Sequence, residues 1–106
     1  CTGGALAARI VNVPGSEVFG TGFVTYSNKA KRKLVMVKKM TLKTVGAVSE
    51  KCAREMAKGG CAASGADVCL SVTGIAALTE GQRKTCGNRF YGLLLPGKSQ
   101  STGVSF

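Results

Sequence analysis

The side chains best suited to chemistry lie between Gly22 and Lys31. A short apolar run passes there into hydroxyl, amide and ammonium groups, as when a buried strand delivers polar side chains at its C-terminal end. Tyr26 can donate a hydrogen bond, Asn28 can donate and accept, and Lys31 can act as a cation or, if desolvated, as a base. A strand followed by a solvated, lysine-rich loop is the alternative, because a charge run is usually a solvated face.

A second hydroxyl follows a second apolar run. Residues 68–72 form a nearly continuous apolar segment, typical of a strand buried on both faces, and the run ends at Thr73 and Gly74. If the two strands are parallel, Tyr26 and Thr73 lie at the same edge of the sheet. This coincidence favours a site there over two unrelated loops.

The elements that position these groups can be predicted from periodicity and caps. Thr2-Gly3-Gly4 is interpreted as a turn that leads into a helix, where backbone N–H groups could approach an anion, or as a plain turn. That helix should end before Pro14. Further helices are expected at residues 28–40 and about 50–63, the second capped by Ser49. The expected inward side chains are Leu6, Ile10 and Val13 in the first helix, Ala30, Leu34, Val35 and Val37 in the second, and Cys52, Ala53, Met56 and Ala57 in the third.

Composition limits the classes of protein and site. The 106 residues provide one domain, and the absence of histidine excludes histidine-activated nucleophiles and most transition-metal sites. Five cysteines without a close pair indicate reduced core residues of a cytoplasmic protein rather than a zinc site or disulfide framework. No apolar run approaches the ~20 residues that a membrane helix needs. We therefore expect no metal, no cofactor and no membrane contact.

The net charge of +10 is concentrated between Lys29 and Lys43, where no acidic residue occurs. Nucleic-acid binding is one interpretation of this run, but no aromatic side chains for base stacking lie within it. A positive rim that attracts a small phosphorylated substrate explains the charge equally well.

Five motifs in register over residues 1–77 resemble the C-terminal domain of the CinA family, the nicotinamide-nucleotide amidohydrolases. The motifs are Cys1-Thr2-Gly3-Gly4 with Ala7-Ala8-Arg9, Val13-Pro14-Gly15-Ser16, Val24-Thr25-Tyr26-Ser27-Asn28 with Lys31, Gly46–Glu50 with Ala53–Ala57, and Gly65-Ala66-Asp67 with Val72–Ala76. The resemblance implies an α/β fold: a three-layer α/β/α sandwich with a mostly parallel (mixed) sheet, here incomplete at both ends.

The resemblance also implies a chemistry: hydrolysis of the carboxamide of nicotinamide mononucleotide to nicotinate mononucleotide and ammonia. In such a site a serine attacks the amide carbon and a lysine is its general base. By position the base is Lys31, with Tyr26 and Thr73 as supporting hydroxyls. The substrate pocket would be lined by Thr2, Gly3, Gly4, Ser27, Asn28 and Gly74. The partner is a small nucleotide substrate, and the intact family domain could form a homo-oligomer.

The chain departs from the family pattern at both ends. The family's nucleophilic serine immediately precedes the position of Cys1, and a strand and a helix before it are also missing from the sequence. Residues 1–77 are therefore interpreted as a partial amidohydrolase domain, truncated and inactive as it stands. Residues 78–106 form a divergent tail of the same domain that could be read out of frame, because codons for residues 83–92 exist that encode the family's K-P-V-G-T-V one nucleotide later. The alternatives are a small basic nucleic-acid-binding protein and a remnant that binds the nucleotide without catalysis.

Overall fold

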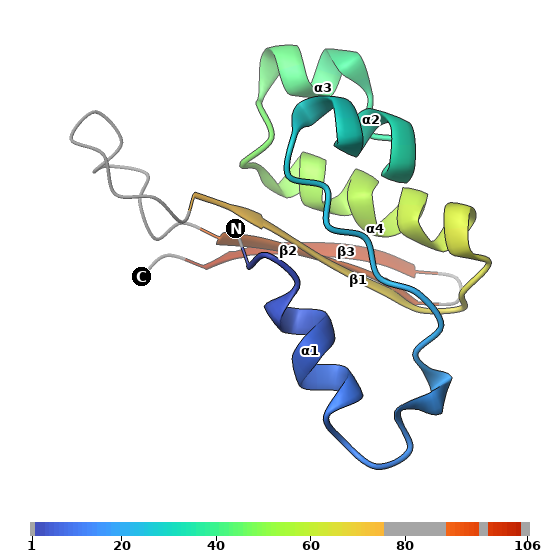
Figure 1. The fold of residues 1–106 in the computed structure, drawn as a ribbon. Helices are drawn as coiled ribbons and strands as arrows, with labels where there is room; N and C mark the ends of the chain where they lie inside the picture. Colours follow the sequence, from blue (N-terminus) through green and yellow to red (C-terminus); the bar gives the residue numbers. More distant parts are fainter. Residues whose placement is uncertain (1, 76–88, 96–97, 105–106) are drawn as a thin grey trace.

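The computed structural model describes residues 2–75, 89–95 and 98–104, which form an α/β fold (Figure 1). Its helices and strands are α1 (Ala5–Val11), the 3-10 turn η1 (Ser16–Val18), α2 (Asn28–Val35), α3 (Lys39–Thr44), α4 (Glu50–Ser64), β1 (Cys69–Gly74), β2 (Arg89–Leu95) and β3 (Lys98–Val104). Strands β2 and β3 lie within residues 78–106, the segment interpreted above as a divergent tail, and residues 78–88 lie outside the described part of the chain.

The described strands make an antiparallel sheet with the order β1-β2-β3. Val72 of β1 lies opposite Tyr91 of β2, and Tyr91 lies opposite Thr102 of β3. The expectation of parallel pairing is therefore not met among the described strands. The strand expected at residues 23–26 is chain without strand pairing in the described structure, and it leads directly into α2.

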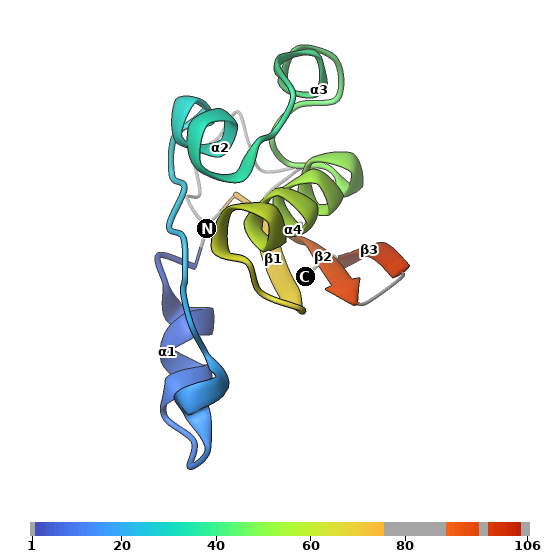
Figure 2. The same cartoon turned by 90° about the vertical axis from the view of Figure 1, so that its right-hand side faces the viewer.

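Helix α4 covers one face of the sheet and separates it from α2 and α3 (Figure 2). The Ser49 hydroxyl caps this helix by accepting a hydrogen bond from the backbone N–H of Cys52 at 3.1 Å. The predicted inward side chains of α4 are all buried, which confirms this part of the prediction. The Ser71 hydroxyl of β1 donates to the Ala53 carbonyl of α4 at 2.5 Å and so joins the helix to the sheet.

Two glycines let other parts of the chain approach α4 closely. A Cβ atom at Gly59 would lie 1.7 Å from the carbonyl oxygen of Val35 at the end of α2. A Cβ atom at Gly92 of β2 would lie 2.1 Å from the Ala53 carbonyl oxygen. Glycine in a helix interior costs about 1 kcal/mol relative to alanine, and at Gly59 this cost is accepted because any side chain would displace α2.

The prediction of one helix over residues 28–40 is wrong. Helix α2 ends at Val35, its C-cap Met36 has a left-handed φ of 59°, and α3 begins only at Lys39. The break turns Val35 and Val37 toward the core with Cys52 and Met56, while Leu34 is 47% exposed instead of inward.

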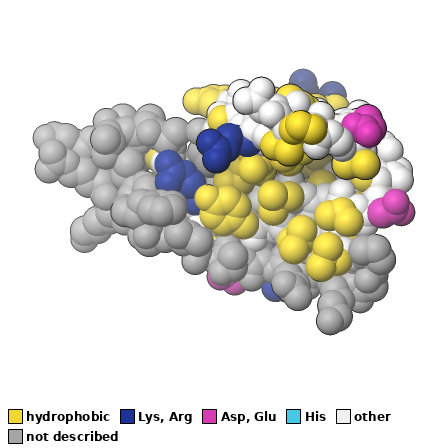
Figure 3. Space-filling view, turned by 90° about the horizontal axis from the view of Figure 1, so that it is seen from below, with side chains coloured by type: hydrophobic (Ala, Val, Ile, Leu, Met, Phe, Trp, Pro, Cys, Tyr) yellow, Lys and Arg dark blue, Asp and Glu magenta, His cyan; other side chains and the backbone are white. Residues whose placement is uncertain are grey.

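Helix α1 and η1 lie on the opposite side of the molecule from α2, α3 and α4 (Figure 1). A helix is confirmed here, but none of its residues is buried, and because it ends at Val11 the predicted inward residue Val13 lies beyond it and is 57% exposed. Seen from this side, hydrophobic side chains gather on the surface (Figure 3). The large exposed hydrophobic residues of residues 10–24 are Ile10, Val11, Val13, Val18, Phe23 and Val24.

Candidate active site

Lys31 is held in a buried position on the first turns of α2. The Ser27 hydroxyl caps the helix by accepting from the Ala30 N–H at 3.0 Å, which fixes the direction in which the helix leaves the extended segment. Although lysine is rarely buried, Lys31 is only 8% exposed. Its Nζ donates hydrogen bonds to the carbonyl oxygens of Thr25 at 2.7 Å and Tyr26 at 3.3 Å.

Burial lowers the pKa of Lys31 from its ordinary value, because the ammonium form loses hydration. The nearby Cys52 thiol acts in the opposite direction. Burial raises the pKa of Cys52 itself to about 11, so this thiol is protonated near neutral pH and supplies no full negative charge to Lys31. Among the described residues no carboxylate pairs with the ammonium, so Lys31 is suited to lose its proton and act as a base.

Lys31 lines a cavity of about 1070 Å³ between the extended segment before α2, the start of α1, α4 and β1. Most of the residues predicted for the site line the same cavity: Thr2, Gly3, Gly4, Tyr26, Lys31, Thr73 and Gly74. The structure thus brings together residues that are more than seventy positions apart in the sequence.

The two predicted hydroxyls differ in their surroundings. Thr73 is 4% exposed, and its Oγ1 donates to the Ala47 carbonyl oxygen at 2.7 Å, so its remaining capacity is as an acceptor. Tyr26 is 88% exposed, and its backbone carbonyl is the group that contacts Lys31.

The other two predicted pocket residues do not line this cavity. Ser27 serves as the helix cap described above. Asn28 lines a different cavity, between α2 and α3. The motif that contains them therefore spans both sides of α2.

Two features of the site were not predicted from the sequence. The first is the pair of backbone carbonyls that orient the Lys31 amine, since a backbone group leaves no signal in residue type. The second is Cys52, which was expected in the core but not beside Lys31. The sequence did place Cys52 on the buried face of a helix capped by Ser49. It could not show that Lys31 is the neighbour of Cys52, because that depends on where α2 packs against α4.

Within residues 2–75 and the two described strands that follow, no group of three or more histidine, cysteine, aspartate or glutamate side chains could hold a metal ion. No described helix is long and apolar enough to cross a membrane.

Comparison with known proteins places the chain in a family. The model of the CinA C-terminal domain matches residues 1–106, and the chain belongs to that family. It is 52% identical over 108 residues to a Clostridium perfringens protein named as competence-damage inducible, covering 100% of this chain and 26% of that protein. It is 50% identical over 101 residues to a CinA-like protein of Kosmotoga olearia, covering 93% of this chain and 24% of that protein.

Solved structures share the fold. A CinA superfamily protein from Escherichia coli aligns with a TM-score of 0.92 at 34% identity, over 100% of this chain and 63% of that one. The competence damage-inducible protein A from Klebsiella pneumoniae aligns with a TM-score of 0.91 at 36% identity, over 100% of this chain and 67% of that one. The chain thus spans about a quarter of the curated relatives and about two thirds of these solved chains.

Proposed function

We propose that the domain to which these residues belong hydrolyses the carboxamide of nicotinamide mononucleotide, with Lys31 as the general base. The observation that carries the proposal is a lysine only 8% exposed that lines a cavity and whose pKa burial lowers. A neutral lysine amine has two N–H bonds and one lone pair. When both N–H bonds are donated to the carbonyls of Thr25 and Tyr26, the lone pair remains free to accept a proton.

In this proposal Lys31 removes the proton of a serine hydroxyl as the oxygen attacks the amide carbon. The proton then passes to the departing ammonia, and water hydrolyses the resulting ester by the same route. Thr2, Gly3 and Gly4 line the cavity at the start of α1, where glycine backbone N–H groups would face the substrate. The nucleophile expected from the family resemblance precedes Cys1, so its position is part of the proposal.

We further propose that the complete sheet of the domain is mixed and forms the middle of three layers. The extended segment before α2 and β1 run in the same direction on either side of the large cavity (Figure 1). Among the described strands, β1 is paired only with β2, so its other edge is open toward that cavity. A parallel strand between the two would pair both open edges, and α1 would then cover the sheet on the face opposite α4.

Ammonia release from nicotinamide mononucleotide tests the proposed activity, using a form of the domain that carries the residues encoded before Cys1. Lys31→Met should abolish most of the turnover, while Lys33→Met should leave it unchanged because Lys33 is exposed on the same helix. Equal loss in the two variants, or no ammonia from the unaltered domain, would overturn the proposal.

Calorimetry with nicotinamide mononucleotide on the 106-residue chain separates binding from catalysis. Binding that Thr73→Val weakens, without ammonia release by the extended domain, would favour a nucleotide-binding remnant over an enzyme. Thr41→Val is the matched control, because it also removes a buried threonine hydroxyl but lies away from the cavity.

A further inference from the structure

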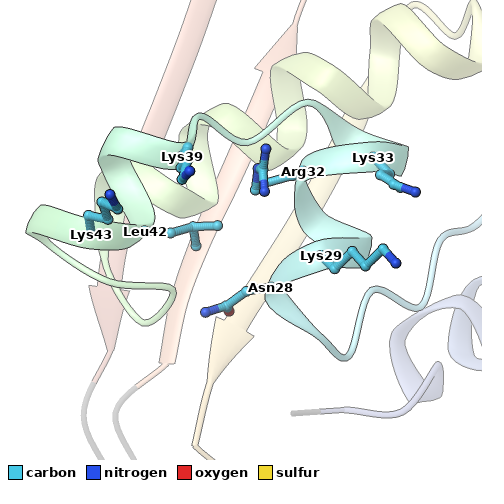
Figure 4. Close-up of a pocket in the computed structure, with 7 residues that line it drawn as sticks. All are labelled: Asn28, Lys29, Arg32, Lys33, Lys39, Leu42 and Lys43. Carbon is cyan, nitrogen blue, oxygen red and sulfur yellow. The ribbon is translucent and has the colours of Figure 1, made fainter.

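A second cavity of about 420 Å³ lies between α2 and α3, on the other side of α2 from Lys31. Its lining is almost entirely cationic and contains no acidic residue: Asn28, Lys29, Arg32, Lys33, Lys39, Leu42 and Lys43. We call these seven residues the basic cleft (Figure 4). The proposed amidohydrolase site gives none of its five cations a role.

The cations of the basic cleft are not neutralised by the fold. Within the described residues, none of the five forms an ion pair. Glu55 of α4 contacts α3, but each of its carboxylate oxygens accepts a hydrogen bond from a group other than these five cations. One accepts from the Lys38 N–H at 2.9 Å and the other from the Thr41 hydroxyl at 2.6 Å. The net charge of the chain is +10, so no general excess of acids offsets this surface.

Five like charges on two short helices raise the electrostatic free energy of the folded state. Glu55 nevertheless holds the start of α3 against α4 through the two hydrogen bonds to Lys38 and Thr41, and α2 packs against the same helix. The fold therefore maintains a repulsive arrangement, and the repulsion would be relieved by an anion placed along the cleft.

The arrangement of the side chains indicates which anion fits. Arg32 and Asn28 extend from α2 toward α3, whereas Lys29 and Lys33 extend away from α3 (Figure 4). Cations that spread over two helices suit a row of phosphates better than one enclosed phosphate group. The cleft lining has no aromatic side chain on which a base could stack, so the bases would not be read.

We propose that the basic cleft binds the phosphate backbone of a nucleic acid without sequence preference. Binding releases the cations condensed on the phosphates, so the affinity falls steeply as salt concentration rises. Because Lys31 lies on the opposite face of α2, the cleft and the amidohydrolase site would act through different side chains of one helix.

Fluorescence anisotropy of a labelled single-stranded DNA of mixed sequence tests this on the 106-residue chain. The test variant is Lys39→Glu/Lys43→Glu, in which two exposed cations of the cleft are reversed. Its matched control is Lys51→Glu/Lys58→Glu, which changes the net charge equally at exposed positions of α4 outside the cleft. Circular dichroism establishes that both variants are folded, and Lys39→Gln/Lys43→Gln replaces the first variant if it is not.

We expect the cleft variant to bind at least tenfold more weakly than the unaltered chain, and the control to change affinity less than threefold. The slope of log affinity against log salt should become shallower by about 1.4, because each phosphate of a single strand that the variant no longer neutralises contributes ~0.7. Equal weakening in both variants would assign binding to net charge and overturn the proposal. Three other results would also overturn the proposal. They are absence of DNA binding at low salt, displacement of the DNA by stoichiometric inorganic pyrophosphate, and binding to anionic lipid vesicles without binding to DNA.

Discussion

Lys31 and Lys33 are two residues apart on α2, yet their surroundings differ in every respect that matters for chemistry. Lys31 is 8% exposed, donates to two backbone carbonyls and lines the larger cavity. Lys33 is exposed and lines the basic cleft. The same side chain is thus a desolvated amine on one face of a helix and a hydrated point charge on the other. What separates them is the packing of α2 against α4, not residue type.

The largest expected effect comes from removing the desolvated amine. In a domain that carries its preceding residues, Lys31→Met should lower kcat by about a thousandfold, within the ~10²–10⁴ range typical of a general base. Lys33→Met should change kcat less than twofold. Steady-state ammonia release measures both, and a Lys31→Met enzyme with normal kcat would remove the chemical distinction between the two faces of α2.

The next largest effect concerns the contact that sets the position of α2. Gly59→Ala should destabilise the fold by about 3 kcal/mol, because the added Cβ would lie 1.7 Å from the Val35 carbonyl oxygen and α2 must shift. Urea unfolding of the 106-residue chain measures this change. Gly20→Ala is the control, since a Cβ there meets nothing within 4 Å and the φ angle is not left-handed, and it should change stability by less than about 1 kcal/mol.

A smaller effect is expected on the side of the basic cleft. Thr41→Val removes the hydroxyl that bonds Glu55 at 2.6 Å and should cost about 1–2 kcal/mol, because a buried hydrogen bond to a charged group is lost. Thr44→Val removes an exposed hydroxyl that bonds only the Met40 carbonyl in its own helix, so its effect should stay within about 0.5 kcal/mol. Comparable losses by urea unfolding would show that Glu55 does not anchor α3.

The smallest effect is the contribution of Lys31 to the pH dependence of stability. Its folded-state pKa lies below the value of 10.5 expected when unfolded, so at pH values between the two the unfolded chain binds more protons. Stability from this group therefore rises as pH increases through that window, and the cost of the buried ammonium is fully present below it. The difference in unfolding free energy between Lys31→Met and the unaltered chain should therefore shift in favour of the unaltered chain as pH rises toward 10.5, and urea titrations at several pH values measure it.

Cys52 modifies the same measurement in the opposite direction. Its folded-state pKa of about 11 exceeds the ordinary value of 9.0, so its contribution to stability is complete below pH 9 and is lost as pH rises toward 11. Repeating the Lys31 titration in a Cys52→Ala background isolates the lysine. An unchanged difference between Lys31→Met and the unaltered chain across the whole range would contradict the desolvated state of this amine.

Much of α4 could be predicted from the sequence because its signals are local. Ser49 at the cap and the spacing of Cys52, Ala53, Met56 and Ala57 specify where the helix starts and which face it buries. Tyr26, Lys31 and Thr73 line one cavity, but Tyr26 lies on chain without strand pairing, so the predicted common sheet edge is not present among the described strands and the roles of these residues stay predictions.

The remaining differences depend on interactions distant in sequence. The end of α2 at Val35 could not be predicted from propensity, because Lys38, Lys39 and Met40 are compatible with a continuous helix. Two distant interactions favour the break. Val37 is buried in the core, and the Lys38 N–H donates a hydrogen bond to Glu55, seventeen residues away. Strand direction is equally non-local. The length of the apolar run predicted β1, but it could not predict the antiparallel pairing with β2, because β2 follows β1 only after a long connection.

The two hydrogen bonds of the Lys31 amine also close a small ring between the extended segment and the helix that follows it. In the described structure these are the hydrogen bonds that the carbonyl oxygens of Thr25 and Tyr26 accept. The lysine therefore acts as a clasp, because it fixes a backbone segment that is otherwise unpaired there. A substrate that draws the amine away would open the clasp. Occupation of the cavity would then change the carbonyl environment of Thr25 and Tyr26, which NMR would detect as shifts of their carbonyl carbon resonances while those of α4 stay unchanged.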